Sequence, residues 1–432
     1  MLQRLSIPAP RRLGRPTAAL VAWSVLLAAA PVRAQDGEDL PPSLIAIVGR
    51  ELPRLLGSNP ATLRAFVANS GTRVPVASQV DERWGSSGDL HYAYETGPEP
   101  VADPDPTFDA DDLLLLPADA AAEERLTDTD GLVEVEVRSR THSGWLYVQR
   151  DASGAPPRSP LTYDPSDDAV CGDRYLLARH APHHALFDDL RLGDLSTAEN
   201  LLDRTKARVD LELAFGLGTV RRTEDDTLAR TTGLHVGPLR IVREVEVRGR
   251  LVFGLYTRPH RDRFVYYRDG FSIPTTVWTT ERATSLLKSI TLHLTMDLNE
   301  HARGLTFSSA PEIPTAIEID GRGGPHGGSE PLQWYLLRNR EVGLLGWLSA
   351  DPGVVENVKL YYNDDMSQPD PPESVPGQFG HHGFIYRASG SIPRGALRLT
   401  THAWVISGRN LDDPTSARGR FEERPTVVVT VR

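Results

Sequence analysis

Along much of the chain, apolar and polar residues alternate with a period of two. The alternation runs over residues 133–138, 209–215 and 290–296, and it returns in the last residues, 427–431. In these segments one set of alternate side chains is mostly Val, Ile or Leu, and the other set is mostly charged or hydroxylated. This period is typical of half-buried antiparallel strands. No internal repeat of fixed length accompanies it, which disfavours a propeller or a solenoid.

Two stretches have a helical character instead. Residues 44–56 are rich in apolar side chains but contain a glycine and a proline, so a short helix and an extended segment both remain open. Residues 196–206 open with Ser196-x-x-Glu199, a capping-box pattern, and predict a helix. The 36 glycines and 34 prolines suit many short strands joined by turns.

The predicted strands fall into two parts. Residues 151–168 are rich in Pro, Asp and Ser, a composition typical of a linker. We therefore expect a small N-terminal β module, 35–155, followed by a large β-sandwich domain, 156–432. The fold class we predict is all-β, mainly antiparallel, with few short helices.

The first 34 residues have the parts of a secretory signal peptide. Arginines and no acidic residue precede an apolar run, 18–30, that is too short to span a bilayer comfortably. The small residues before Gln35 form a cleavage pattern, so the mature chain is expected to begin there. We expect export to the periplasm, the outer surface or the medium, with an uncleaved anchor as the alternative. No later segment approaches membrane-spanning length, so we expect no membrane span in the mature chain.

The charge and the cysteine content narrow the possible classes of protein further. The 47 basic and 58 acidic residues give a net charge of −11, which argues against a nucleic-acid partner because such a partner requires a basic face. Cys171 is the single cysteine, so no intramolecular disulfide can form even in an oxidising compartment. Stability must therefore come mainly from a buried core.

Three short motifs resemble known exported proteins. Residues 74–82 (VPVASQVDE) and 108–116 (FDADDLLLL) resemble a motif pair in an uncharacterised family of secreted bacterial β-sandwich proteins. Residues 237–243 (GPLRIVR) resemble, more remotely, a strand of galactose-mutarotase-like supersandwich proteins. The resemblance implies export and a sandwich or supersandwich for the large domain. Leu113 stands where the second motif has a glutamate, so any role of that glutamate, including metal ligation, is not carried over.

The segment 103–112 is a candidate calcium site. Calcium binds six to eight oxygen ligands from a flexible loop, and alternate aspartates can converge on one ion. The spacing is not that of an EF-hand, because Phe108 stands where that loop needs glycine. A solvated acidic turn is the alternative. The proposed ligands are Asp103, Asp105, Asp109, Asp111 and Asp112.

The segment 239–256 predicts a strand with one apolar and one charged face. Its apolar face includes Ile241 and Val245. Paired carboxylates and guanidiniums on the other face can hold sugar hydroxyls, whereas cross-strand ion pairs on a solvated sheet are the alternative. The ligand-binding candidates, which we call the charged row, are Arg240, Glu244, Glu246 and Arg248.

The evidence for catalytic residues in the sequence is weaker. Tyr256 and His260 follow the charged row, and a tyrosine or histidine base is what a β-elimination lyase or a mutarotase requires. His180, His183 and His184, with Cys171 upstream, offer transition-metal ligands, but Pro182 breaks the helix that would align them. There is no nucleophile elbow, phosphate-binding glycine loop or dinucleotide fingerprint.

These observations favour an exported, non-catalytic protein that binds carbohydrate or another cell-envelope component. A polysaccharide-active enzyme of lyase or mutarotase type is the first alternative. A structural or assembly protein of the cell surface is the second. Apart from calcium, no cofactor is expected.

Overall fold

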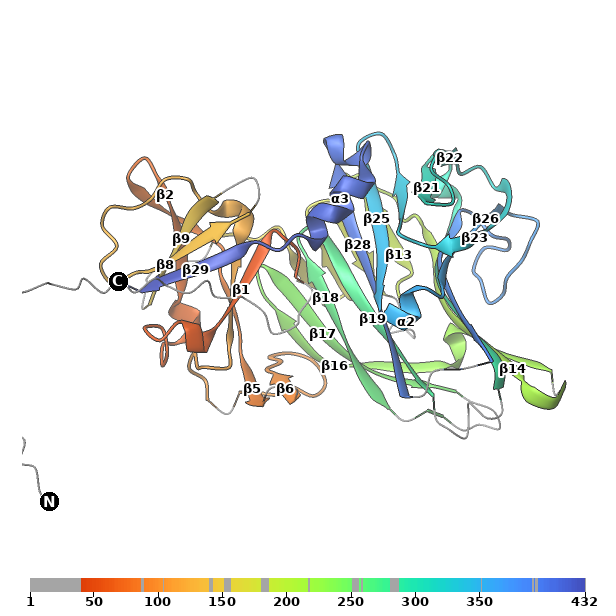
Figure 1. Ribbon diagram of the computed structural model, residues 1–432, viewed down its shortest axis with the longest axis horizontal. Helices are drawn as coiled ribbons and strands as arrows, with labels where there is room; N and C mark the ends of the chain where they lie inside the picture. The colour runs from red at the N-terminus through yellow and green to blue at the C-terminus, as the bar shows by residue number, and fades with distance from the viewer. Residues whose placement is uncertain are drawn as a thin grey trace, which may run out of the picture.

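The computed structural model describes residues 40–86, 89–103, 105–139, 143–150, 157–179, 186–216, 218–250, 256–257, 259–279, 287–350, 352–390, 392 and 395–431. The predicted signal peptide and the three histidines of 180–184 lie outside these ranges. Within them the chain forms two lobes side by side along its longest axis, with the C-terminal end beside the smaller lobe (Figure 1).

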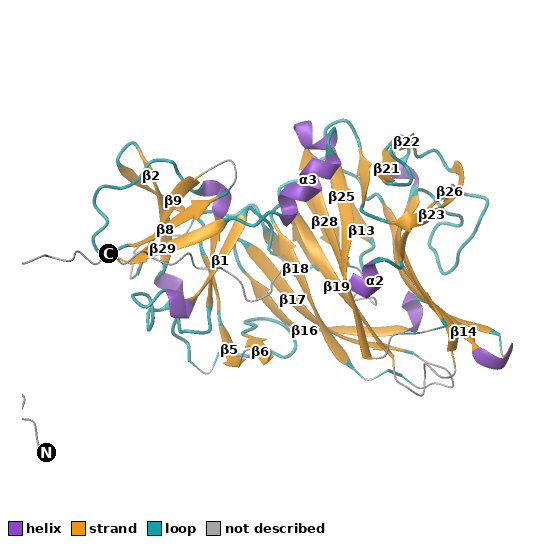
Figure 2. Cartoon of the chain, in the orientation of Figure 1, coloured by secondary structure: helices purple, strands orange, loops and turns teal. Residues whose placement is uncertain are grey.

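The prediction of an all-β, mainly antiparallel fold is confirmed. Strands dominate both lobes, and the strand pairs are antiparallel (Figure 2). Among the described residues, the α-helices are α2 (Pro352–Val355) and α3 (Pro414–Glu422), and the other helical pieces are short 3₁₀ turns. No described helix is long and apolar enough to cross a membrane.

The smaller lobe contains two sheets and a hairpin. One sheet has the order β1 (Leu44–Val48), β7 (Leu113–Pro117) and β4 (Gln79–Asp81). The other has the order β29 (Thr426–Val431), β8 (Val133–Arg138), β9 (Ser143–Gln149), β2 (Arg64–Asn69) and β3 (Thr72–Val76). The hairpin is β5 (Arg83–Ser86) and β6 (Asp89–Tyr92).

The last strand of the chain belongs to this lobe. We assigned residues 427–431 to the large domain, but β29 pairs with β8, and Val429 lies opposite Val135. Val427 is fully buried and packs in the core of the smaller lobe with Val135 and Leu146. The alternation predicted the strand correctly, but it contains no information about which sheet the strand completes.

The larger lobe is a β-sandwich. Its nine-stranded sheet has the order β16 (Thr227–Val236), β17 (Arg240–Gly249), β18 (His260–Tyr267), β19 (Gly270–Thr279), β28 (Gly395–Ser407), β25 (Val342–Ala350), β24 (Trp334–Arg338), β21 (Thr306–Ala310) and β22 (Ile317–Glu318). Its six-stranded sheet has the order β15 (Thr219–Arg222), β14 (Leu202–Leu213), β20 (Leu287–Leu298), β27 (His381–Ser389), β26 (Val358–Asp365) and β23 (Arg322–Pro331).

A smaller sheet and a shared core complete the lobe. The third sheet has the order β10 (Thr162–Asp164), β11 (Ala169–Cys171), β12 (Tyr175–Ala178) and β13 (Asp189–Leu192). One apolar cluster joins all three sheets, with Leu177 from the small one, Val245 from the nine-stranded one and Leu292 from the six-stranded one. The burial of Val245 confirms the predicted apolar face of its strand.

The predicted helix over 196–206 is wrong. Ser196 does not cap a helix, because its backbone N–H and its hydroxyl both donate to Asp194, which closes a turn. The twelve-residue strand β14 then begins at Leu202. In the segment 44–56, the extended alternative is correct for β1, and a single 3₁₀ turn, Gly49–Glu51, follows it.

Candidate functional site

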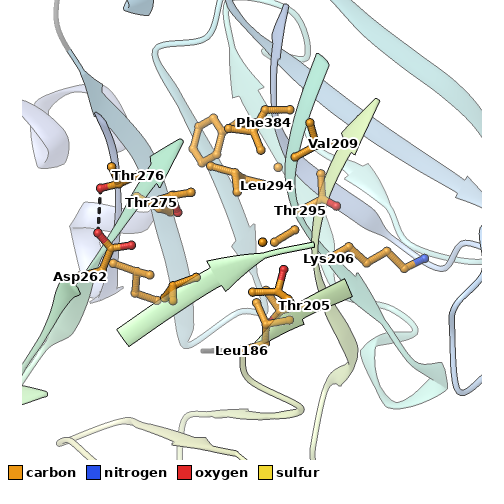
Figure 3. A pocket seen from close by; sticks show the side chains of 18 of the residues that line it. Leu186, Thr205, Lys206, Val209, Asp262, Thr275, Thr276, Leu294, Thr295 and Phe384 are labelled. Atoms are coloured by element: carbon orange, nitrogen blue, oxygen red, sulfur yellow. Dashed lines mark hydrogen bonds between the residues drawn. The ribbon is translucent and has the colours of Figure 1, made fainter. Parts of the chain in front are cut away.

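A cavity of about 300 Å³ lies between the two large sheets of the sandwich. Val209 and Leu211 of β14 and Leu294 of β20 line it from the six-stranded sheet. Phe264 of β18 and Phe271 of β19 line it from the nine-stranded sheet. The lining is mostly apolar, and Figure 3 shows Val209, Leu294 and Phe384 among the side chains that line it. A concave, largely apolar space with a few polar groups is the usual form of a small-molecule site.

The sequence of β14 explains why one side of that strand is apolar and the other is charged. Its alternate residues Thr205, Ala207 and Val209 line the cavity. The intervening Lys206 and Arg208 project to the opposite face of the sheet, and Figure 3 shows Lys206 extending away from the cavity. Strand alternation therefore keeps the two formal charges out of the apolar space.

One wall carries a small polar group. The Thr276 hydroxyl donates to Asp262 Oδ1 at 2.8 Å, and His260 Nε2 lies 3.5 Å from Asp262 Oδ2. Neither imidazole nitrogen of His260 makes a hydrogen bond within the described part of the chain. Asp262 thus places one carboxylate, hydrogen-bonded to Thr276, in an otherwise mostly apolar lining.

The residues that line the cavity range from buried to exposed. Tyr335 and Phe384 are buried. Arg222 is partly exposed and Arg250 is exposed, and Asp226 lies 3.7 Å from the first and 3.8 Å from the second. Backbone hydrogen bonds join the segments around Arg250 and Asp226, and we call this part of the lining the mouth, formed by Arg222, Thr223, Asp226, Thr227, Gly249, Arg250 and Thr257.

The two catalytic candidates lie at different places around this cavity. His260 is in the wall, on the inner face of the nine-stranded sheet, opposite Val247 in register. Tyr256 is 42% exposed and forms a β-bridge with Arg250 at the mouth. The charged row that we expected beside them lies on the outer face of the same sheet, so the backbone of the sheet separates His260 from Glu244 and Glu246.

Arg240 of the charged row is buried between the two lobes. Its Nε donates to Asp81 Oδ2 at 2.5 Å, and Asp81 also lies 3.0 Å from His235. Burial opposes ionisation of Asp81, but the charges of Arg240 and His235 hold the pKa of its carboxyl well below the usual range. Arg240 is thus engaged in a buried ion pair, apart from any exposed surface of the row.

The Gln79 side chain completes this contact. Its Oε1 accepts hydrogen bonds from the backbone N–H groups of Leu239 and Arg240, each at 2.9 Å, and its Nε2 donates to Asp81 and to the Arg240 carbonyl. A Cβ atom on Gly237 would lie 2.0 Å from the Gln79 side chain, so this close approach requires glycine. Two motifs that the sequence placed far apart, 74–82 and 237–243, therefore meet at the junction of the lobes.

The other members of the row form ion pairs, some between neighbouring strands and one within β17. Glu244 accepts from Arg261 at 2.8 Å, and Glu246 accepts from Arg248 at 2.9 Å. Arg230 of β16 also reaches Glu246, at 3.3 Å. These pairs have the geometry expected of a charged sheet face. Ligand binding by Glu244, Glu246 and Arg248 stays a prediction.

The aspartates of 103–112 accept hydrogen bonds from the backbone. Asp109 Oδ1 accepts from the N–H groups of Asp111 and Asp112, and Asp112 accepts from those of Arg83 and Asp109. Asp103 and Asp105 each close a similar local turn. Burial raises the pKa of Asp112 to about 7. Among the described residues, no three His, Cys, Asp or Glu side chains are grouped as metal ligands, and calcium binding stays a prediction.

A buried charged cluster on the outer face of the six-stranded sheet has no signal in the sequence pattern. Lys206 is fully buried and donates to Asp297 at 2.5 Å, while Arg208 donates to Glu224 and to the carbonyl of Asp370. Burial raises the pKa of Asp297 to about 7, although the Lys206 ammonium opposes the shift. These contacts attach the segment 368–378 to the sheet.

Comparisons with known proteins give distant structural matches. No family model matches the chain, and no curated protein matches its sequence. Among solved structures it is similar to an alpha-mannosidase from Enterococcus faecalis V583, with 10% identity and a TM-score of 0.46, over 89% of this chain and 42% of that one. A putative aldose 1-epimerase from Escherichia coli K12 has 7% identity and a TM-score of 0.31, over 57% of this chain and 100% of that one.

A third match, a structure titled HI1317, has 10% identity and a TM-score of 0.34, over 58% of this chain and 100% of that one. This chain spans less than half the length of the mannosidase it matches. At these identities and TM-scores the similarities assign no activity, and the argument for function rests on the residues of this chain.

Proposed function

We propose that the protein binds the hydrocarbon part of a cell-envelope component in the intersheet cavity and does not convert it chemically. The observation that carries the proposal is the cavity itself, about 300 Å³ with mostly apolar walls, which is at the lower end of the usual size range of ligand pockets, roughly 300–1,000 Å³. Transfer of an alkyl chain from water into such a space is favourable by about 0.8 kcal/mol for each methylene. The predicted signal peptide supports a partner in the envelope.

Two features of the wall favour binding over catalysis. A general base needs to lie within hydrogen-bond reach of the group it deprotonates, and a nucleophile needs such a base beside it. His260 is the imidazole nearest to a carboxylate in the wall, yet no hydroxyl, thiol or amine hydrogen-bonds to it within the described residues. Thr276, the nearby hydroxyl, donates to Asp262 instead.

A cavity-filling variant tests the proposal. The neutral, apolar dye N-phenyl-1-naphthylamine is titrated into the full mature protein, and its fluorescence reports transfer out of water. Ala207→Phe places a ring into the cavity, because Ala207 lines it on β14. Ala61→Phe, at an exposed 3₁₀ turn of the smaller lobe, is the matched control.

We expect saturable dye binding by the parent and by Ala61→Phe, and binding weakened at least tenfold in Ala207→Phe. Thermal melts of all three proteins establish that each is folded. A folded parent that binds no dye, or a folded Ala207→Phe that binds it as tightly as the parent, would refute the proposal.

The second candidate is carbohydrate binding on the outer face of β17. The observation that favours it is the pairing of Glu246 with Arg248, whose side chain is 46% exposed. Paired carboxylate and guanidinium groups can bind sugar hydroxyls through charge-assisted hydrogen bonds. Binding of the parent to a glycan array, weakened in the double variant Glu244→Gln/Glu246→Gln, would support this candidate. Release of unsaturated or reducing sugar ends would indicate an enzyme instead.

A further inference from the structure

A loop covers part of the outer face of the six-stranded sheet. Residues 366–380 join β26 to β27, and we call them the strap. The ends of the strap are held together, because the Gln378 backbone N–H donates to the Asp365 carbonyl and the Gln378 side chain donates to the Gln368 carbonyl, each at 3.2 Å. At Gly377, with a φ of +101°, a Cβ atom would lie 2.3 Å from the carbonyl oxygen of the first strap residue. A compact surface loop whose ends meet in this way can move as one unit.

The strap places one carboxylate among three cationic side chains of the sheet. Asp370 Oδ2 lies 2.7 Å from Arg208 Nη1 and 3.6 Å from Lys206 Nζ. The other oxygen, Oδ1, accepts a hydrogen bond from Arg221 at 2.9 Å. Lys206 and Arg208 belong to β14, and Arg221 belongs to the neighbouring β15. The three cations therefore share the carboxylate of Asp370.

The sheet also contacts the main chain of the strap. Arg208 donates to the carbonyl of Asp370 at 2.7 Å and to the carbonyl of Pro372 at 2.6 Å. The carboxylate of Asp203, next to the first residue of β14, accepts the backbone N–H groups of residues 374–375 at 3.2 and 2.9 Å. Side chains of the sheet thus bind a carboxylate, two carbonyls and two N–H groups, which are the contacts that a bound peptide makes.

The strap is held by polar contacts. Within the described chain, no residue of 366–376 belongs to an apolar cluster. When the strap is away from the sheet, Lys206 keeps Asp297 as its counter-ion. Arg208 likewise keeps Glu224. Opening returns these ionised groups to water, which offsets part of the cost of the lost contacts. A segment with few buried apolar contacts opens at a lower free energy than the whole fold does.

We propose that the strap is the internal occupant of a peptide site, and that an acidic, proline-containing segment of a partner protein displaces it. A carboxylate of the partner takes the place of Asp370 among the three cations, and clusters of arginine are a common means of recognising acidic motifs. The sequence of 370–373, Asp-Pro-Pro-Glu, indicates the chemistry of that segment. Proline lowers the entropy that such a segment loses on binding, because its φ is already fixed. The site lies on the face of β14 opposite the cavity, so this inference does not depend on the proposed function.

The test measures binding of a synthetic peptide to the full mature protein. The peptide has the sequence of residues 366–379 and a fluorescent label, and its anisotropy reports binding. Asp370→Asn weakens the strap in the protein, so we expect this variant to bind the peptide about tenfold more tightly than the parent, the change expected from the loss of one charge-assisted contact. Asp128→Asn, in an exposed turn of the smaller lobe, is the matched control and should bind as the parent does. An uncharged peptide, with Asp370→Asn and Glu373→Gln, should bind at least about tenfold more weakly than the charged one.

A variant of the sheet assigns the binding to the cations. Arg221→Gln, made together with Asp370→Asn, should weaken binding of the peptide severalfold because one of the three cations is lost. Arg221 is 42% exposed, so its replacement is compatible with folding. Arg138→Gln is the matched control, since Arg138 is 55% exposed and pairs with Glu136 in the smaller lobe. It should leave binding of the peptide unchanged.

Hydrogen exchange, measured without peptide, follows the strap directly. In Asp370→Asn, the amides of the strap should exchange about tenfold faster than in the parent, while those of β20 keep their rate. Glu373→Gln is a second strap variant, because Glu373 accepts the backbone N–H groups of Asp370 at 3.0 Å and Gly377 at 3.1 Å. It should change peptide binding and strap exchange in the same directions. Thermal melts establish that each variant is folded.

The outcomes decide both the site and the class of its ligand. The proposal is refuted if neither folded strap variant binds the peptide more tightly than the parent, or if the uncharged peptide binds as tightly as the charged one. It is also refuted if the strap amides of both variants exchange at the parent's rate, since the acidic residues would then not hold the strap closed. Hexagalacturonate is titrated in parallel as an acidic saccharide. Binding of hexagalacturonate without binding of the peptide would contradict the peptide inference and indicate a saccharide site.

Discussion

The buried pair of Asp81 and Arg240 offers the sharpest prediction about stability. Asp81 and Arg240 are each 1% exposed, and their contact joins the smaller lobe to the first residue of β17. Asp81→Asn keeps the volume of the side chain and removes its charge, which leaves the Arg240 guanidinium buried without its counter-ion. Breaking a buried ion pair by removal of one partner costs about 3–5 kcal/mol.

The magnitude can be measured by urea unfolding followed through tryptophan fluorescence. With a urea dependence of roughly 1–3 kcal/mol/M, the expected loss moves the unfolding midpoint down by about 1 M or more. Replacement of both partners, Asp81→Asn with Arg240→Met, should recover much of the loss because the buried guanidinium is removed together with its counter-ion. Glu422→Gln breaks the exposed pair with Arg418 and serves as the control, with an expected cost of about 0.3–0.5 kcal/mol.

The reasoning would be refuted by a midpoint for Asp81→Asn no lower than that of Glu422→Gln. It would also fail if the double variant were less stable than Asp81→Asn, since the cost would then not come from the loss of the counter-ion of Arg240. Equal urea dependences in all four proteins are required for the comparison.

Three further predictions concern other parts of the molecule. Burial opposes the charged form of His235, but Asp81 raises the pKa of its imidazole from 6.5 to about 10. The stability that charged His235 contributes is therefore full below pH 6.5 and is lost as the pH rises towards 10, and His235→Gln should flatten this decline in thermal melts. Val245→Asp places an unpaired carboxylate in the sandwich core and should cost on the order of 3–5 kcal/mol in urea unfolding, whereas an unaltered midpoint would contradict the burial of Val245. If the aspartates of 103–112 bind calcium, millimolar calcium should raise the melting temperature relative to chelator, and identical melts would reject the site.

Local patterns predicted the strands well because alternation is imposed by the strand itself. Residues 133–138 and 290–296 form parts of β8 and β20, and Val245 is buried as its position in the alternation requires. The pattern failed at Ser196, where a capping residue and a turn residue have the same chemistry, and only the position of Asp194 decided between them.

The candidate site was harder to predict because it depends on which segments cover each face of a sheet. Alternation placed Arg240 on the polar face of β17 but carried no information that Asp81 and Gln79 would bury that end. The cavity is formed by residues of several strands from two sheets, and its volume depends on the separation of those sheets. One signal was present in the sequence: His260 was identified as a candidate, and it lies in the cavity wall.

The most direct test of the central claim, an apolar cavity that binds an alkyl chain, is a chain-length series. Dissociation constants of straight-chain alcohols from hexanol to tetradecanol are measured by displacement of N-phenyl-1-naphthylamine from the mature protein. The account predicts that each added methylene lowers the dissociation constant up to about fourfold, the equivalent of about 0.8 kcal/mol, until the cavity is full and the gain stops. A dissociation constant that does not depend on chain length would contradict the account.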